Sequence, residues 1–447
     1  MEKEIEKEYF ELLRFESVGA DPSKRRESAA CASWLSRWLG NIGFAAEIIA
    51  PDDGSAPGIV FAERAGAEGA ARVLVYGHYD VQPADPVDEW ETPPFEPTVK
   101  DGRVYCRGAQ DDKGQSFAFL CGLRDYLAGV GPGEGLNIKV LLEGQEETGS
   151  AFLMKKAPEM RRRLAADVLL VCDTSAANDL RPAIVAGLRG VAHLTVKLEG
   201  ASRDLHSGVY GGVAPNAAQG MAELLASLHS PSGAIAVEGF LDGIEPPSGE
   251  ELKAAEESSP DDAQYLADMG CEPVGGEEGK KAVVRNCFEP TVEINGIHSG
   301  YGGPGSKTVI PSTAVAKISL RFVPGQSNRL AVDAVVAHLK SHAPRGMKLS
   351  VEEVNYGAGG FRLPIASPIF RLATEVLAEI DGRGAAFMWD GASIPVVSVL
   401  RGASGAAPLI VGWGQNEDRI HAPNESYSFR QFDTARLWGR KILSALA

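Results

Sequence analysis

Apolar runs and amphipathic segments alternate over roughly the first 180 residues of the chain. Residues 73–76 form a short continuous apolar run, which is typical of a strand buried on both faces of a sheet, and two further strands are expected at residues 138–142 and 168–171. Elsewhere in this part of the chain the spacing of apolar side chains or the composition predicts helices: residues 28–39, 115–128 and 155–164. Strands separated by helices predict a parallel, three-layer α/β/α sheet.

A different pattern begins near Gly187. Residues 192–199 alternate apolar and polar side chains, as expected for a strand with one face in water. Similar arguments predict two helices and three further strands: helices at residues 216–229 and 328–340, and strands at 291–295, 314–323 and 347–355. The order βαββαβ is that of a ferredoxin-like α+β module. An acidic stretch rich in proline, glycine and serine, residues 236–285, interrupts this module, and we assign it no chemistry.

The α/β pattern returns after residue 356, with an expected helix at residues 368–380, a buried strand at 408–412 and a final helix after Phe429. The chain is therefore expected to contain one α/β domain made of residues 1–186 and 357–447. An α+β domain, residues 187–356, would be inserted into it.

Composition excludes several classes of protein. The 447 residues carry 44 basic and 60 acidic side chains, and a net charge of −16 argues against nucleic-acid binding. No apolar run reaches the length of a membrane span, and the N-terminus is charged from its second residue, unlike a signal peptide. Six cysteines are scattered without paired spacing, so reduced, buried thiols in a cytoplasmic protein are expected.

Polar side chains follow the three apolar strands of the first domain. His78 and Asp80 come after the first strand, Glu146 and Glu147 after the second, and Asp173 after the third. Open α/β sheets place their ligand sites at the carboxyl ends of the strands. We therefore expect these side chains to gather at one edge of the sheet.

The loop from Arg107 to Gly114 carries two adjacent aspartates between glycines, just before a predicted helix. A carboxylate has two oxygens, so Asp111 could bridge two metal ions; the alternative is an acidic cap of the helix. His421 adds an imidazole from a loop near the C-terminus. Taken singly, each of these residues could be an ordinary turn or capping residue. Together, imidazole and carboxylate groups without a thiolate suit two zinc ions, or manganese or cobalt.

Several motifs carry a family resemblance: GHYDVQP at 77–83, RGAQDDKG at 107–114, EGQEETGS at 143–150, DLHSGVYGG at 204–212 and GPGSKTVIP at 303–311. In this order they resemble the dinuclear metallopeptidase family that includes carnosinase, bacterial dipeptidases, aminoacylase, glutamate carboxypeptidase and succinyl-diaminopimelate desuccinylase. The resemblance runs from about residue 10 to the C-terminus. It is strongest to the carnosinase-like, nonspecific dipeptidase branch, and implies a catalytic α/β domain with an inserted lid and dimerisation domain.

The resemblance also implies roles for the residues at the sheet edge. One metal ion would bind His78, Asp111 and Asp173, and the other would bind Asp111, Glu147 and His421. Glu146 would be the general base, which takes a proton from a metal-bridging water and gives it to the leaving amine. Asp80 would orient the imidazole of His78. A non-proline cis peptide bond is implied between Asp111 and Asp112.

Three further residues are implicated in the same way. His206, in the inserted domain, would reach the active site of a partner subunit and stabilise the oxyanion, so that a homodimer is required. Arg321 would bind the free carboxylate of the substrate, a role that suits its planar guanidinium group. Ser393 would lie against the substrate.

The function that the resemblance implies is hydrolysis of small peptides by a dipeptidase. At the position that matches Asp173, dipeptidases and aminopeptidases of this family carry aspartate, whereas its carboxypeptidases and N-acyl-amino-acid hydrolases carry glutamate. Two alternatives remain open: an N-acyl-amino-acid deacylase or carboxypeptidase of the same family, and a binding module that has lost catalysis. The presence of every ligand and of Glu146 argues against the second.

Overall fold

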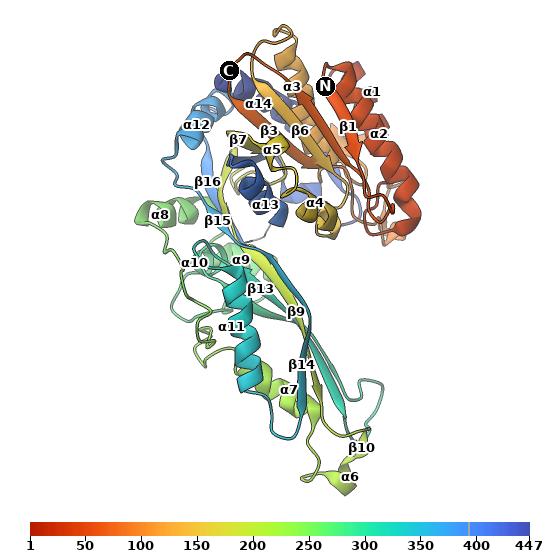
Figure 1. Ribbon diagram of the computed structural model, residues 1–447, viewed down its shortest axis with the longest axis vertical. Helices are drawn as coiled ribbons and strands as arrows, with labels where there is room; N and C mark the ends of the chain where they lie inside the picture. The colour runs from red at the N-terminus through yellow and green to blue at the C-terminus, as the bar shows by residue number, and fades with distance from the viewer. Residues whose placement is uncertain (392–393) are drawn as a thin grey trace. The chain divides into compact units, whose positions relative to one another are not determined.

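The computed structural model describes residues 1–391 and 394–447 of the chain, which form two compact units (Figure 1). The first unit contains Met1–Ala186, Leu363–Met388 and Val396–Ala447. The second contains Gly187–Arg362 and Trp389–Pro395, so it continues past residue 356 to the end of the short strand β15 (Phe361–Arg362). Ser393, expected to lie against the substrate, falls outside the described residues.

A mixed sheet is the centre of the first unit. Within this unit its order is β1-β2-β6-β3-β7-β17-β8, with β16 paired to β8. The strands are β1 (Ala45–Ile49), β2 (Ile59–Arg64), β3 (Arg72–His78), β6 (Asn137–Glu143), β7 (Val168–Val171), β8 (Ala183–Leu188), β16 (Ala386–Asp390) and β17 (Ala407–Gly412). The strands β6, β3, β7 and β17 are parallel to one another, as predicted. The flanking strands β1, β2 and β8 pair in the antiparallel sense, which corrects the expectation of a wholly parallel sheet.

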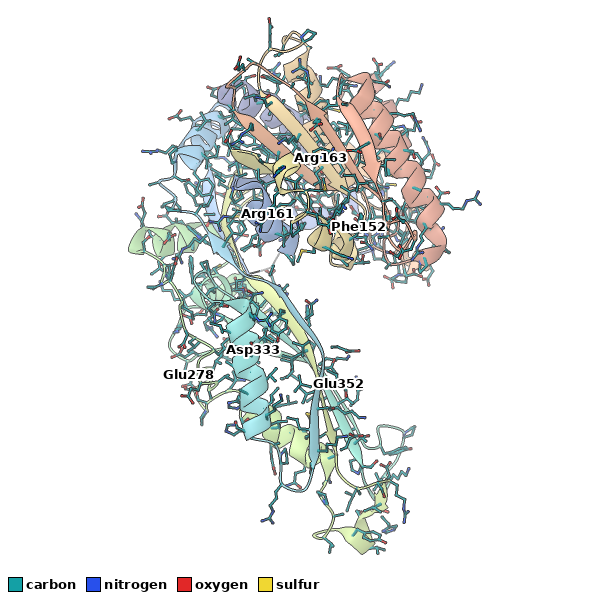
Figure 2. All side chains as sticks on the ribbon, in the orientation of Figure 1. Phe152, Arg161, Arg163, Glu278, Asp333 and Glu352 are labelled. Atoms are coloured by element: carbon teal, nitrogen blue, oxygen red, sulfur yellow. The ribbon has the colours of Figure 1, made fainter. Side chains whose placement is uncertain are left out.

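The antiparallel flank has a local cause. Only a short connection separates β1 from β2, and a short connection joins antiparallel neighbours, whereas parallel strands need a long crossover. β2 then pairs with β6 in the antiparallel sense. On this flank the guanidinium carbon of Arg163, labelled in Figure 2, lies 4.4 Å from the centre of the Phe61 ring.

Helices cover both faces of this sheet. An aromatic cluster joins four of them: Tyr9 lies 4.9 Å from Phe432, and Trp38 lies 5.2 Å from Phe117, measured between ring centres. These helices are α1 (Lys3–Leu13), α2 (Arg25–Asn41), α3 (Lys113–Leu127) and α14 (Phe429–Leu446). In Figure 1 the short helices α4 (Ala151–Lys156), α5 (Arg161–Leu164) and α13 (Pro395–Ser404) are drawn in front of the sheet. The remaining helix is α12 (Pro368–Ile380).

The helix predicted at residues 155–164 is instead two helices, α4 and α5. Pro158 stands between them, and proline removes a backbone donor and clashes with the preceding turn. A small sheet of order β18-β5-β4 completes the first unit. Its strands are β4 (Thr98–Lys100), β5 (Arg103–Tyr105) and β18 (Ser426–Ser428).

The second unit has an antiparallel sheet of order β11-β13-β9-β14. These strands are β9 (Gly190–Glu199), β11 (Thr291–Ser299), β13 (Thr313–Phe322) and β14 (Lys348–Ala358). One face packs on α7 (Ala217–Ala226) and α11 (Asn328–Ser341) in a core that includes Leu194, Ile318, Met221 and Val335. Tyr356 of β14 donates a 2.8 Å hydrogen bond to Asp333 of α11, which Figure 2 labels.

The stretch of residues 236–285 has its own helices, α8 (Gly249–Ser258), α9 (Asp262–Met269) and, at its end, α10 (Ala282–Cys287). β10 (Leu205–His206) pairs in the antiparallel sense with β12 (Val309–Ile310), and α6 (Ser207–Tyr210) follows β10 directly in the sequence. Among the described residues, none of the helices combines the length and apolar character needed to cross a membrane.

Candidate metal centre

The loop that carries Asp111 is held by a buried glutamate from the C-terminal part of the chain. One oxygen of Glu425 accepts hydrogen bonds from the backbone N–H groups of Gln110 (2.9 Å) and Asp111 (3.1 Å). The other accepts from the backbone of Gly108 (2.9 Å) and from the guanidinium of Arg107 (2.8 Å). Pairing of β18 with β5 brings Glu425 next to this loop. This role could not be predicted from the sequence, because the partners of Glu425 lie more than 300 residues away along the chain and leave no local pattern around it.

The carboxylate of Asp111 lies between two imidazoles. Its Oδ1 is 3.2 Å from Nε2 of His78, and its Oδ2 is 2.8 Å from Nε2 of His421. The peptide bond between Asp111 and Asp112 is cis, which confirms that expectation. Each oxygen of one carboxylate therefore faces a different histidine, which is the arrangement that a bridging ligand needs.

Each histidine has a second carboxylate beside it. Nε2 of His78 lies 3.7 Å from Oδ2 of Asp173, and Nε2 of His421 lies 3.3 Å from Oε2 of Glu147. The structure thus brings together all five residues that the sequence proposed as ligands. Two donor groups result, one around each imidazole, and both are made of nitrogen and oxygen only.

Asp112 adds a carboxylate that the sequence analysis did not count as a ligand. Donor atoms of His78, Asp112 and Asp173 lie within 4.8 Å of one another, as do those of Asp111, Glu147 and His421. However, Oδ2 of Asp112 already accepts hydrogen bonds from the backbone of His78 (3.2 Å) and from the Ser116 hydroxyl. Asp111, whose Oδ1 directly faces Nε2 of His78, is the better candidate on this side.

Asp80 holds both the imidazole of His78 and the turn of the two glutamates. Nδ1 of His78 lies 3.0 Å from the backbone oxygen of Asp80 and 3.4 Å from its Oδ1. The two carboxylate oxygens accept hydrogen bonds from the backbone N–H groups of Glu146 and Glu147, both at 3.1 Å. A Cβ atom at Gly19 would lie 2.6 Å from Oδ2 of Asp80, so a glycine is needed there.

Carboxylates outnumber cationic groups in this region. Burial raises the pKa of Asp112 and of Glu146 to about 8, and it also raises the pKa of Asp173. Burial opposes ionisation of Asp111 too, but hydrogen bonds with His421 and His78 hold its pKa well below the usual range. Hydrogen bonds to Asp111 and Glu147 raise the pKa of His421 to about 10. Burial therefore disfavours the charged form of most of these carboxyl groups, whereas hydrogen bonds favour the charged forms of Asp111 and His421.

The donor atoms fit divalent cations. One buried carboxylate oxygen of a proposed ligand, Oε1 of Glu147, has no hydrogen-bond partner in the described part of the chain. The nearby cationic side chains are engaged elsewhere: Arg107 pairs with Glu425, and Lys113 donates to the backbone oxygen of Phe15 at 2.6 Å. Buried charge of one sign is costly unless it is paired or coordinates a metal.

The other proposed site residues belong to the second unit. His206 is exposed; its Nδ1 accepts a 3.0 Å hydrogen bond from the backbone of Gly208, and its Nε2 lies 3.4 Å from the Thr308 hydroxyl. Arg321 is half-buried on β13, opposite Thr291 of β11.

The fold and this donor set define a metal-dependent hydrolase. Residues 74–444 match the model of peptidase family M20/M25/M40, and the chain belongs to this family. It is a metallopeptidase that uses divalent metal.

Two curated relatives and one solved structure illustrate the similarity. The chain is 30% identical over 391 residues to a Cys-Gly metallodipeptidase of Schizosaccharomyces pombe (84% of this chain, 80% of the relative). It is 28% identical over 426 residues to the Beta-Ala-His dipeptidase of Rattus norvegicus (92% and 86%). An M20 family metallo-carboxypeptidase from Sulfolobus solfataricus has the same fold, with a TM-score of 0.86, 24% identity and coverage of 100% and 99%.

Proposed function

We propose that this metallopeptidase hydrolyses the peptide bond of dipeptides with two divalent cations. The observation that carries the proposal is the position of Asp111, whose two carboxylate oxygens face two different imidazoles. The relatives named as dipeptidases span most of the chain and support the substrate class.

His78, Asp111 and Asp173 would hold one cation, and Asp111, Glu147 and His421 the other. We assign zinc to both positions, with manganese or cobalt as alternatives that the same donors accept. When bound, such cations lower the pKa of water and polarise the carbonyl group of the scissile bond.

Glu146 is assigned as the general base. It accepts a proton from the attacking water and passes it to the nitrogen of the leaving amine. Asp80 fixes the turn that carries Glu146, because it accepts a hydrogen bond from the backbone of that residue. Asp80 also accepts a hydrogen bond from the backbone N–H of Glu147, so it supports this proposed metal ligand in the same way.

The second unit is proposed to act as a lid and as the dimerisation domain of a homodimer. Exposed apolar side chains at Val209, Tyr210 and Val213 lie next to His206 in the sequence and support an interaction surface there. In the dimer, His206 would stabilise the oxyanion in the partner's active site. Arg321 would bind the C-terminal carboxylate of the substrate, and Ser393, which is outside the described residues, would lie against the substrate.

A cytoplasmic location is proposed from the thiols. All six cysteines are free, and five of them are buried. Disulfides form in oxidising compartments, so free thiols fit a reducing one.

One experiment distinguishes the proposed dipeptidase from its two alternatives, a deacylase or carboxypeptidase and a binding module without catalysis. Protein loaded with zinc, manganese or cobalt is assayed with dipeptides, N-acetyl amino acids and N-capped longer peptides. We expect turnover of dipeptides with a free amino terminus. Turnover of only the N-acylated or N-capped compounds would instead identify a deacylase or carboxypeptidase. Bound metal without turnover of any compound would indicate a binding module.

A further inference from the structure

The carboxylate of Glu147 is held by an amide from the segment that follows β3. Nε2 of Gln82 donates a 2.7 Å hydrogen bond to Oε2 of Glu147. The side chain of Glu147 is 6% exposed, and its Oε1 has no hydrogen-bond partner among residues 1–391 and 394–447. An ionised carboxylate accepts at both oxygens, so the contact with Gln82 leaves acceptor capacity for a cation.

The backbone on either side of Gln82 is fixed. The backbone N–H of Val81 donates to the backbone oxygen of Ser17 at 3.0 Å. The backbone oxygen of Pro83 accepts a 3.0 Å hydrogen bond from the guanidinium of Arg107. Because these contacts already hold the segment, the amide of Gln82 can face the carboxylate with little further loss of conformational freedom.

Glu147 is also held at a second point. Its backbone N–H donates to Oδ2 of Asp80 at 3.1 Å, and Asp80 lies two residues before Gln82. The segment 78–82 therefore carries His78, a proposed ligand of one cation, and holds the backbone and the side chain of a proposed ligand of the other. The two proposed cation sites are built on one segment but depend on different side chains of it.

A neutral amide suits this position better than a charged side chain. Lysine or arginine at position 82 would neutralise the carboxylate of Glu147 and compete with a cation for it. A second carboxylate would repel it. The amide donates a hydrogen bond and leaves the net charge of the ligands unchanged.

From these contacts we infer that Gln82 is a positioning residue: its amide sets the orientation of the Glu147 carboxylate, and so the affinity for the cation that Glu147 and His421 would share. The inference rests on the proposed function. A residue that orients a metal ligand contributes about 10- to 100-fold in metal affinity. The loss should fall on one of the two cations, because other proposed ligands have their own supports in Glu425 and Asp80.

Gln82→Met and Gln219→Met form a matched pair of variants. Methionine keeps an unbranched side chain but cannot donate a hydrogen bond. Gln219, on α7 of the second unit, also donates from Nε2 to a glutamate, Glu223, at 2.9 Å, but it is exposed. Gln82→Leu, which also lacks a donor, should repeat the effect of Gln82→Met and keeps the test available where Gln82→Met folds poorly.

The experiment titrates the metal-free wild-type protein and the variants with zinc against a competing chelator, which gives an affinity for each of the two cations. Urea denaturation of the metal-free proteins reports folding. The visible absorption of the cobalt-loaded proteins reports the ligand geometry at each cation.

In Gln82→Met, one zinc affinity should fall about 10- to 100-fold, while the other affinity and the urea midpoint stay at the wild-type values. One set of cobalt bands should change and the other should remain, and Gln219→Met should match the wild type throughout. Two unchanged affinities in Gln82→Met, an equal fall in both, or the same fall in Gln219→Met would overturn the inference. Wild-type protein that binds fewer than two zinc ions would contradict the proposed function itself.

Discussion

Glu425→Gln tests how the loop of Asp111 is held in place. The glutamate accepts four hydrogen bonds, two on each oxygen, and both Glu425 and Arg107 are 1% exposed. A glutamine keeps one accepting oxygen and replaces the other with an amide that only donates. The new amide would then face donors instead of acceptors. Depending on its orientation, these donors are the backbone N–H groups of Gln110 and Asp111, or the backbone N–H of Gly108 and the guanidinium of Arg107.

The expected loss is large because the guanidinium of Arg107 also loses its countercharge. Removing one partner of a buried ion pair costs about 3–5 kcal/mol. We therefore expect the free energy of unfolding of the metal-free variant to fall by about that amount, measured by urea denaturation. Displacement of Asp111 should weaken metal binding about 10- to 100-fold, the usual effect of removing a residue that orients a ligand.

Glu143→Gln is the matched control. Glu143 is also 1% exposed, but burial raises its pKa to about 8, so it is mostly protonated at neutral pH. The hydroxyls of Tyr76 (2.7 Å) and Ser150 (2.9 Å) donate to one of its oxygens, which glutamine retains. We expect this variant to lose about 1 kcal/mol or less and to keep its metal affinity. Metal titration against a competing chelator compares the two variants, and equal affinity in Glu425→Gln and Glu143→Gln would refute the reasoning.

Three further predictions concern the proposed site. Glu146→Gln should lower kcat about 10²- to 10⁴-fold while metal content, measured by elemental analysis, stays unchanged; full turnover in this variant with metal bound would remove Glu146 as the base. Metal removal with a chelator should abolish turnover and lower the melting temperature. Added zinc should restore both, because a ligand that binds only the folded state stabilises that state. A melting temperature that does not change when zinc is added would contradict the proposed site. Gly77→Ala would place its Cβ atom 1.9 Å from the Ser116 hydroxyl and 3.0 Å from Oδ2 of Asp112, so we expect a loss of about 1–3 kcal/mol in unfolding free energy, whereas an unchanged urea midpoint would show that α3 can move away.

The central strands and their polar ends could be predicted because their signals are local. Short, mainly apolar runs mark β3, β6 and β7, and the position of His78 at the end of β3, and of Glu146 and Asp173 shortly after β6 and β7, follows from the chain itself. The flank of β1 and β2 was missed: β1 is largely exposed and carries no continuous apolar run, whereas the buried apolar run at the start of β2, residues 59–62, was a local signal that the prediction did not use.

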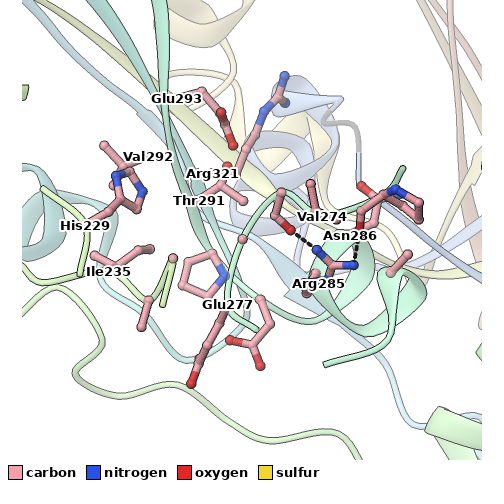
Figure 3. A pocket seen from close by; sticks show the side chains of 18 of the residues that line it. His229, Ile235, Val274, Glu277, Arg285, Asn286, Thr291, Val292, Glu293 and Arg321 are labelled. Carbon is pink, nitrogen blue, oxygen red and sulfur yellow. Dashed lines mark hydrogen bonds between the residues drawn. The ribbon is translucent and has the colours of Figure 1, made fainter. Parts of the chain in front are cut away.

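Other features depend on contacts between distant parts of the chain. Glu425 meets the Asp111 loop only after β18 has paired with β5, and no spacing within the sequence encodes that meeting. The same is true of Asp80, whose bonds to the backbone of Glu146 and Glu147 are formed across neighbouring strand ends. The second unit also has a cavity of about 1000 Å³ (Figure 3), and one of its walls comes from the stretch 236–285, which has no periodic pattern, so the sequence alone did not reveal it.

The pairing of β18 with β5 also bears on biosynthesis. His421 and Glu425 are added to the growing chain after the whole second unit has been translated. A nascent polypeptide that still lacks this terminal segment carries His78, Asp111 and Asp173 but neither the second imidazole nor the glutamate that secures the Asp111 loop. The complete pair of donor groups therefore forms only after residues 421–425 have been translated, and a product that terminates before them cannot assemble it.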